Sequence, residues 1–79
     1  MIQEKKEYVI LTFRNTTSAI AMEKRCRMSG IPGRLMPVPR EISASCGTAW
    51  RMQAEEYEQY RESIKKTGIE MEKTVRMLL

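Results

Sequence analysis

The residues best suited to chemistry lie in the stretch "MPVPREISASCGTAW", positions 36–50 of this 79-residue chain. Its centre is Cys46, and a thiol acts as a nucleophile only as the thiolate, which cations or backbone N–H groups stabilise. Gly47 leaves the next peptide free to turn its N–H toward the sulfur and lets a second protein approach closely. Ser43 and Ser45 add hydroxyl donors. The stretch is therefore a candidate for a reactive thiol.

Two arginines and two prolines surround this cysteine in the sequence. Arg40 and Arg51 bracket it with guanidinium groups that keep their charge, and we expect them to support the thiolate. Pro37 and Pro39 would hold the approach to Cys46 in one shape. The alternative is a half-buried small residue that closes a strand connection, since cysteine is among the most commonly buried residue types. The residues alone leave both interpretations open.

The second cysteine calls for a different interpretation. Ala19, Met22 and Cys26 follow one another at spacings of three and four residues, an apolar helical stripe that predicts a core position for Cys26. The chain has no histidine and no aspartate, so we expect neither a metal site nor a cofactor. No histidine can act as a general base, and no acidic constellation falls in the stretch apart from Glu41, which disfavours a hydrolase and favours a carrier or adaptor over a stand-alone enzyme.

Composition places the chain among ordinary globular proteins, with 42% hydrophobic and 30% charged residues. No apolar run is long enough for a membrane span or a secretory signal, so we expect a cytoplasmic location without a membrane partner. In that reducing compartment we do not expect a disulfide. The net charge is +4, and the bases concentrate in residues 1–40. They either solvate the surface or form a positive patch for an anionic substrate or acidic partner. The candidates for such a patch are Arg14, Lys24, Arg25, Arg27, Arg34 and Arg40.

Alternating and helical patterns divide the first half of the chain. Residues 7–13, "EYVILTF", are rich in β-branched and aromatic side chains and predict a central strand. Residues 14–28 predict a helix that begins at an Asn or Thr cap and ends at Gly30. Residues 34–38 predict a short strand, whose prolines keep its far end out of a fully paired position.

The second half repeats the order. Residues 48–53 alternate as in a strand, with Trp50 and Met52 on one face. Residues 54–68 carry acids in the first turn, lysines in the last and a terminal glycine, which predicts a helix. The closing residues 69–79 alternate again.

This order of elements predicts an α+β protein with a ferredoxin-like split βαβ sandwich: a four-stranded antiparallel sheet with both helices on one face. We expect one domain over residues 1–79, because a chain this short must use most of its apolar residues in a single core. Residues 1–6 form a polar lead-in, and residues 72–79 are either a C-terminal tail or an extension of the last strand.

Three segments resemble a known family. "TFRNTTSAIAMEK", "SGIPGRLMPVPREISASCGTAWRM" and "KKTGIE" are similar to the putative Se/S carrier protein-like family of small bacterial and archaeal proteins. The most specific part is the block from Pro39 to Ser43 followed by Cys46-Gly47. The chain departs from the pattern at Cys26, where a larger aliphatic residue is usual, and at Thr48.

The resemblance implies a carrier that holds sulfur or selenium on Cys46 as a persulfide or perselenide and passes it from a donor to an acceptor protein. The competing hypothesis is a binding module for a small anion, RNA or a protein, with Cys46 in a structural role. Only Phe13 and Trp50 could stack on bases, so nucleic acid is not the expected partner. A third hypothesis is a subunit that adds a strand to a partner's sheet. The sequence leaves open the element carried, the partners and whether the chain forms a homodimer.

Overall fold

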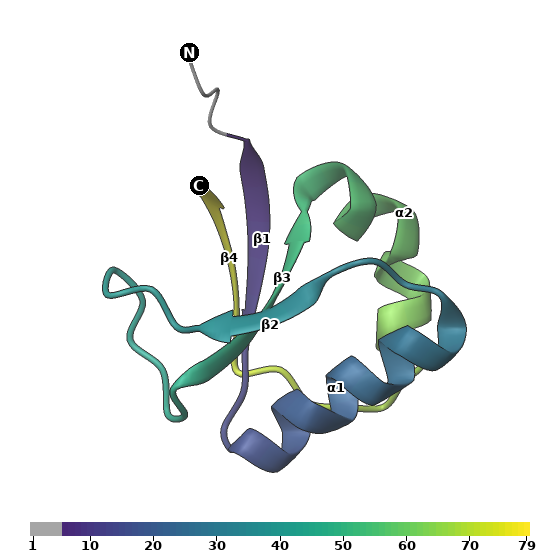
Figure 1. The fold of residues 1–79 in the computed structure, drawn as a ribbon, viewed down its shortest axis with the longest axis horizontal. Helices are drawn as coiled ribbons and strands as arrows, with labels where there is room; N and C mark the ends of the chain where they lie inside the picture. Colours follow the sequence, from purple (N-terminus) through teal and green to yellow (C-terminus); the bar gives the residue numbers. More distant parts are fainter. Residues whose placement is uncertain (1–5) are drawn as a thin grey trace.

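The computed structural model describes residues 6–79, which form one four-stranded sheet with two helices packed on one of its faces (Figure 1). Most of the expected polar lead-in, residues 1–5, lies outside the described residues. The elements in chain order are β1 Glu7–Thr12, α1 Thr16–Ser29, β2 Arg34–Pro37, β3 Thr48–Gln53, α2 Ala54–Lys65 and β4 Lys73–Leu78.

The strands follow the order β2-β3-β1-β4, and every neighbouring pair is antiparallel. Each helix connects two strands that are separated by a third, so β1 and β3 occupy the centre of the sheet. This confirms the predicted α+β sandwich, and the order is compatible with a ferredoxin-like topology. In the register, Leu11 faces Trp50 on one side and Thr74 on the other.

Strand β1 is buried on both faces, as its nearly continuous apolar sequence predicts. Val9 and Leu11, together with Phe13 just beyond the strand, point into the core beneath the helices. Because side chains alternate along a strand, Ile10 and Thr12 point to the opposite face, where both are also fully buried. The centre of the sheet is therefore the most protected part of the molecule.

Helix α1 begins and ends where the sequence predicts. Asn15 is the N-cap, and its Oδ1 accepts the backbone N–H of Ser18 at 2.8 Å. Gly30 ends the helix in the left-handed conformation, with φ of 70°, which glycine adopts without steric cost. The stripe that faces the sheet consists of Ala19, Met22 and Cys26, all fully buried.

Helix α2 follows β3 without a loop. The side chain of Glu56 accepts the backbone N–H of Gln53 at 3.1 Å and so caps the first turn. Ile64 is the fully buried anchor of this helix, while Tyr57 and Tyr60 pack on the core from its edge. The longer of the two helices has 14 residues, so no helix in residues 6–79 is long and apolar enough to cross a membrane.

The last strand begins later than its alternating pattern suggests. Ile69 and Met71 pack on the core in an irregular segment, and β4 starts only at Lys73. The irregular segment ends at Glu72. The backbone N–H of Glu72 donates to the carbonyl of Thr12 at 2.7 Å and starts the pairing with β1. Most of the segment 72–79, which the sequence left as a tail or a strand extension, is a paired edge strand.

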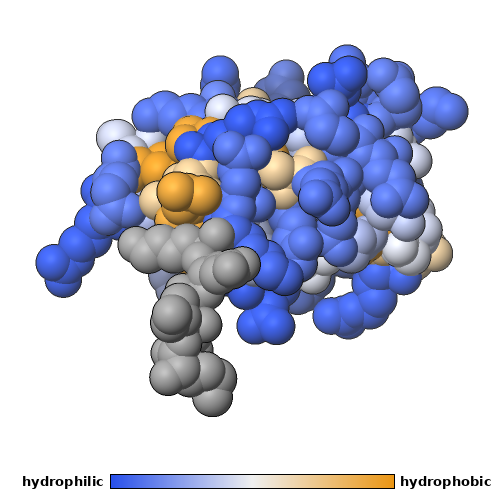
Figure 2. Space-filling model, turned by 90° about the horizontal axis from the view of Figure 1, so that it is seen from above, coloured by the Kyte–Doolittle hydropathy of each residue, from blue (hydrophilic) through white to orange (hydrophobic). Residues whose placement is uncertain are grey.

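Within residues 6–79, no helix covers the face of the sheet opposite α1 and α2. Apart from its buried centre, it exposes part of several apolar side chains, and Figure 2 shows hydrophobic residues at the surface on the left, the side away from the helices. By strand alternation this open face includes Tyr8, Met36, Val75 and Met77. The rest of the visible surface is predominantly hydrophilic.

Candidate functional site

The loop that connects β2 to β3, residues 38–47, carries the thiol and is closed at its base. The backbone N–H of Val38 bonds the carbonyl of Gly47 at 3.0 Å, which extends the β2–β3 pairing by one bond. Within the loop, the N–H of Ile42 bonds the carbonyl of Pro39 at 3.0 Å and forms a turn. The loop is thus a projection with a fixed base and a turn near its tip (Figure 1).

Cys46 lies at the end of this loop, two residues before β3. Its side chain is half-buried and packs against the hydrophobic core. The Sγ–H donates a hydrogen bond to the carbonyl oxygen of Thr48 at 3.2 Å. A thiolate has no proton to donate, so reaction of the sulfur as a nucleophile requires this bond to be released. Cys46 is therefore placed at the boundary between core and solvent.

Two side chains at the start of β4 anchor the loop. The carboxylate of Glu72 accepts the backbone N–H of Ser45 at 2.9 Å with one oxygen and the Ser45 hydroxyl with the other. The ammonium group of Lys73 donates to the carbonyl oxygen of Ser43. Because Ser45 precedes Cys46 directly, these contacts determine where the thiol sits relative to the sheet.

The Ser45 hydroxyl and backbone N–H hold the pKa of Glu72 below its usual range, with smaller contributions from Lys73 and Arg14. The carboxylate is therefore ionised at neutral pH and remains a full acceptor for the loop. Beside it lies an open cavity of about 460 Å³, lined by Arg14, Ser45, Glu70, Met71 and Glu72. The surroundings of the loop are thus polar, with charges of both signs.

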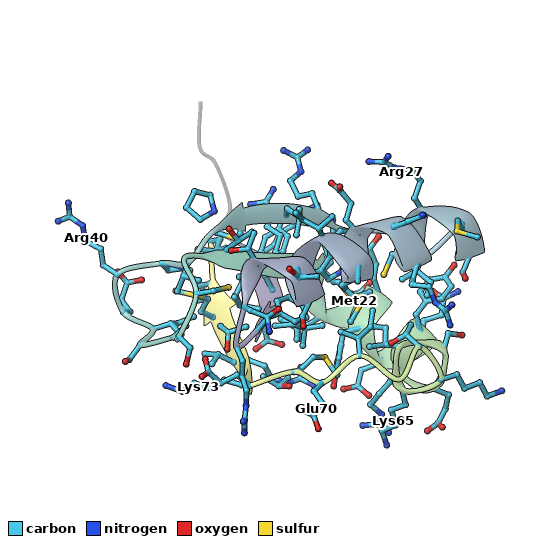
Figure 3. All side chains as sticks on the ribbon, turned by 90° about the horizontal axis from the view of Figure 1, so that it is seen from below. Met22, Arg27, Arg40, Lys65, Glu70 and Lys73 are labelled. Atoms are coloured by element: carbon cyan, nitrogen blue, oxygen red, sulfur yellow. The ribbon has the colours of Figure 1, made fainter. Side chains whose placement is uncertain are left out.

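The structure does not bring the two predicted arginines to the sulfur. Arg40 lies at the exposed tip of the loop and extends away from the body of the protein (Figure 3). Arg51 belongs to β3, where alternation turns it to the open face of the sheet, and its guanidinium lies 4.8 Å from the centre of the Tyr8 ring. Arg40 and Arg51 are thus near Cys46 in the sequence, but one lies at the loop tip and the other on the open face of the sheet.

Gly47 is not required by the fold at its position. Its φ is not positive, and a Cβ built on it would meet nothing within 4 Å. The space that a Gly47 side chain would fill is therefore open within the described residues. The Ser45 hydroxyl, in contrast, donates to Glu72 rather than to the sulfur, and the backbone carbonyl of Ser43 accepts from Lys73.

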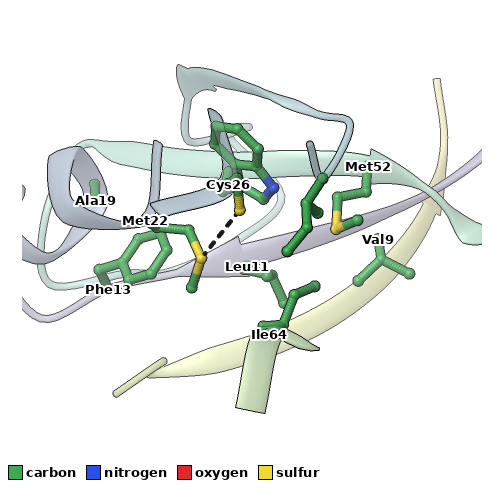
Figure 4. Packing of buried hydrophobic residues seen from close by; sticks show 10 residues of the cluster. Val9, Leu11, Phe13, Ala19, Met22, Cys26, Met52 and Ile64 are labelled. Carbon is green, nitrogen blue, oxygen red and sulfur yellow. Dashed lines mark hydrogen bonds between the residues drawn. The ribbon is translucent and has the colours of Figure 1, made fainter. Parts of the chain in front are cut away.

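Cys26, the other cysteine, is enclosed by the core. It is 0% exposed, and its Sγ–H donates to Met22 Sδ at 3.6 Å (Figure 4). Burial raises the pKa of the Cys26 thiol to about 11. The prediction that the two thiols differ in burial is confirmed, and both are free.

Sequence reasoning missed the anchors Glu72 and Lys73. They lie 27 and 30 residues from the loop residues that they bind, and nothing local marks them as functional. The signal that could have found them is topological. If β4 pairs with β1 in an antiparallel direction, the residues at its start must reach the same end of the sheet as the β2–β3 loop.

Comparison with known proteins adds the family. The family model described as "Putative Se/S carrier protein-like" matches residues 7–76. The chain belongs to this family. The matched region includes the Cys46 loop and both of its anchors, Glu72 and Lys73, so the whole candidate site lies inside it. Searches of curated proteins and of solved structures found no match.

Proposed function

We propose that this protein carries sulfur or selenium on Cys46, as a persulfide or perselenide, and transfers it to an acceptor protein. The observation that carries the proposal is the contrast between the two thiols in a member of this family. Cys26 is fully buried, whereas Cys46 reaches the surface in a projecting loop. A partner can reach only the second of them without opening the core.

Loading is a thiol–persulfide exchange. The Cys46 thiolate attacks the outer sulfur of a donor persulfide, a new S–S bond forms, and the donor's own S–S bond breaks. The donor leaves as a thiolate and takes up the proton that Cys46 released, so no external oxidant or reductant is needed. A perselenide donor transfers its selenium in the same way.

Unloading reverses the roles. A nucleophile of the acceptor attacks the outer atom, and Cys46 leaves as a thiolate, which regains its proton and its bond to Thr48. In this scheme each cycle begins with displacement of the Sγ–H from the Thr48 carbonyl. The open space beside Gly47 supports direct contact between the sulfur and a partner.

The loop supplies position rather than catalysis. Glu72 and Lys73 hold Ser45 and Ser43, so the thiol is presented from a loop with two side-chain anchors. Arg40, at the tip, is placed to attract an anionic donor or an acidic partner at longer range. Arg51 has no direct part in this scheme, since it lies over Tyr8.

A second candidate, a binding module in which Cys46 only packs, is favoured by the contacts of Cys46 with the core and with the Thr48 carbonyl. The structure supports RNA binding by base stacking less than the sequence does, because Phe13 and Trp50 are buried beneath the helices. This module would bind its partner without any covalent change at sulfur.

Intact mass distinguishes the two candidates. The protein is incubated with a cysteine desulfurase and its substrate, or with glutathione persulfide as a small donor. A carrier gains one sulfur atom in the wild type and in Cys26→Ala, gains none in Cys46→Ser, and loses the added atom to excess thiol. The carrier proposal fails if the wild type gains no sulfur from either donor, or if Cys46→Ser gains as much as the wild type.

A further inference from the structure

The open face of the sheet divides into an apolar part and a basic part. Pairing and alternation place Tyr8, Val75 and Met77 on the half formed by β1 and β4. They place Arg34 and Arg51 on the half formed by β2 and β3. The side chains of the apolar part are only partly buried, and Figure 2 shows hydrophobic residues at the surface on this side. The face therefore presents apolar surface directly beside positive charge.

The two arginines of the basic part stand opposite each other. Arg34 of β2 and Arg51 of β3 are register partners, so their side chains leave adjacent strands on the same face. Like charges directly opposite each other in a sheet are destabilising. Neither guanidinium forms an ion pair with any residue from 6 to 79. The described chain thus leaves this concentration of positive charge without a counter-charge.

Both guanidiniums border the same open cavity. Its volume is about 290 Å³, and Tyr8, Arg34 and Arg51 are among the residues that line it. The guanidinium of Arg51 lies 4.8 Å from the centre of the Tyr8 ring, which holds it at the boundary with the apolar part. Glu56 also borders the cavity, but its carboxylate accepts the backbone N–H of Gln53. An acidic group that enters the cavity therefore meets two unpaired guanidiniums.

The acidic complement to this face has to come from outside the described chain. By register, none of the strand residues on the open face carries a carboxylate. The third cation on this face, Lys73, already donates to the carbonyl of Ser43. Helix α2 is rich in glutamates, but it lies on the other side of the sheet. Charge complementarity therefore selects an acidic partner.

The side chains of the apolar part indicate a protein rather than a nucleic acid. Single-stranded RNA binds to such sheets by stacking its bases on several aromatic rings. Here Tyr8 is the one aromatic residue on the open face of the described strands, and Arg51 already lies over its ring. The other apolar residues, Val75 and Met77, are aliphatic and suit the apolar side chains of a protein segment.

We propose that the open face binds an amphipathic segment of a partner protein. Its acidic side chains contact Arg34 and Arg51, and its apolar side chains cover Val75 and Met77. Carboxylates match the planar fork of a guanidinium with two parallel hydrogen bonds. The segment covers the open face as α1 and α2 cover the opposite one. Cys46 packs against the core on the helix side, so the proposal does not rest on sulfur transfer.

Nitrogen–proton correlation NMR tests the proposal on the whole chain. The probe is an amphipathic peptide with leucines along one side and glutamates beside them. The backbone signals of Arg51, Val75 and Met77 should shift in a saturable way as this peptide is added. A matched peptide with glutamine in place of every glutamate should bind at least about tenfold more weakly, because it lacks the charges that complement the arginines.

Variants show whether binding depends on this face. Arg34→Gln should weaken binding of the acidic peptide about fivefold, the effect of losing one partly exposed ion pair. Arg25→Gln removes the same charge from α1, on the other side of the sheet, and should leave the affinity unchanged. Val75→Thr keeps the branched shape and the strand preference but adds a hydroxyl, and should weaken binding about threefold.

Several results would overturn the proposal. The first is an absence of saturable shifts on the open face. The second is equal binding of the glutamate and glutamine peptides, and the third is equal weakening by Arg34→Gln and Arg25→Gln, which would mean a general response to net charge. Tighter binding of oligouridylate than of the acidic peptide would make RNA the occupant. Shifts of the same signals with protein concentration alone would make a second copy of the chain the occupant.

Discussion

The separation of the two thiols gives the sharpest prediction. Iodoacetamide at neutral pH should modify Cys46 in the native protein and leave Cys26 almost untouched. Cys46 is half-buried, and its Sγ–H donates to the backbone carbonyl of Thr48. Cys26 is fully enclosed under α1, so the reagent reaches it only in molecules that open.

The size of the difference follows from access. The reagent meets Cys26 only in molecules that open, and an opening that costs about 2 kcal/mol leaves about one molecule in thirty accessible. In closed molecules burial raises the pKa of Cys26 from 9.0 to about 11, so the thiolate there is about a hundredfold scarcer at neutral pH. The closed form therefore adds little to the rate, and we expect Cys26 to react at least about thirtyfold more slowly than Cys46.

The assay is a time course of intact mass, with peptide mapping to assign each adduct. The native wild type should stop at one adduct, and Cys46→Ser should stay unmodified over the same time. In concentrated urea both thiols should react at similar rates, which is the internal control. If Cys26 reacts within tenfold of Cys46 in the native protein, the burial and the raised pKa of Cys26 do not protect it, and the reasoning is refuted.

Three further predictions concern stability and the loop. Because the folded Cys26 thiol keeps its proton up to pH about 11 and the unfolded one only to about 9, stability present below pH 9 is lost as the pH rises between these values. Urea denaturation should show a loss of up to about 2.7 kcal/mol more in the wild type than in Cys26→Ala, and parallel pH profiles would contradict it. Gly33→Ala places a Cβ 2.6 Å from an indole carbon at positive φ and should lower the free energy of unfolding by about 3 kcal/mol. Gly47→Ala, which meets nothing within 4 Å, should change it by less than about 0.5 kcal/mol, and similar urea midpoints for the two variants would rule this out. Glu72→Gln removes the charge from the loop anchor, so hydrogen exchange at the Ser45 amide should be about fivefold faster, whereas an unchanged rate would show that the anchor is not needed.

Local signals were sufficient for the order of elements and for most of the core. The cap at Asn15, the stop at Gly30 and the stripe through Met22 and Cys26 each depend on neighbours within a few residues. The same holds for the alternation that puts Trp50 and Met52 on one face. Such features are readable because a helix or strand imposes its own period on the sequence.

The rest depended on pairing between distant segments. The pattern predicted the last strand from Ile69, but only the pairing of β4 with β1 determines that it starts at Lys73. The candidate loop was found from Cys46, whereas its anchors were not, since their partners are fixed by sheet order. Proximity in sequence was also misleading for Arg51, because a strand sends successive side chains to opposite faces.

The anchoring of the loop by β4 has a consequence for the order in which the protein assembles. Ser45 and Glu72 are 27 residues apart, and contacts of such separation form late, after local helices and turns. During synthesis the loop with Cys46 is made before the strand that holds it, because the chain grows from its N-terminus. Until residues 72–78 pair with β1, the thiol belongs to an untethered loop. Docking of the last strand is thus the step that converts an ordinary cysteine in a nascent chain into a positioned one.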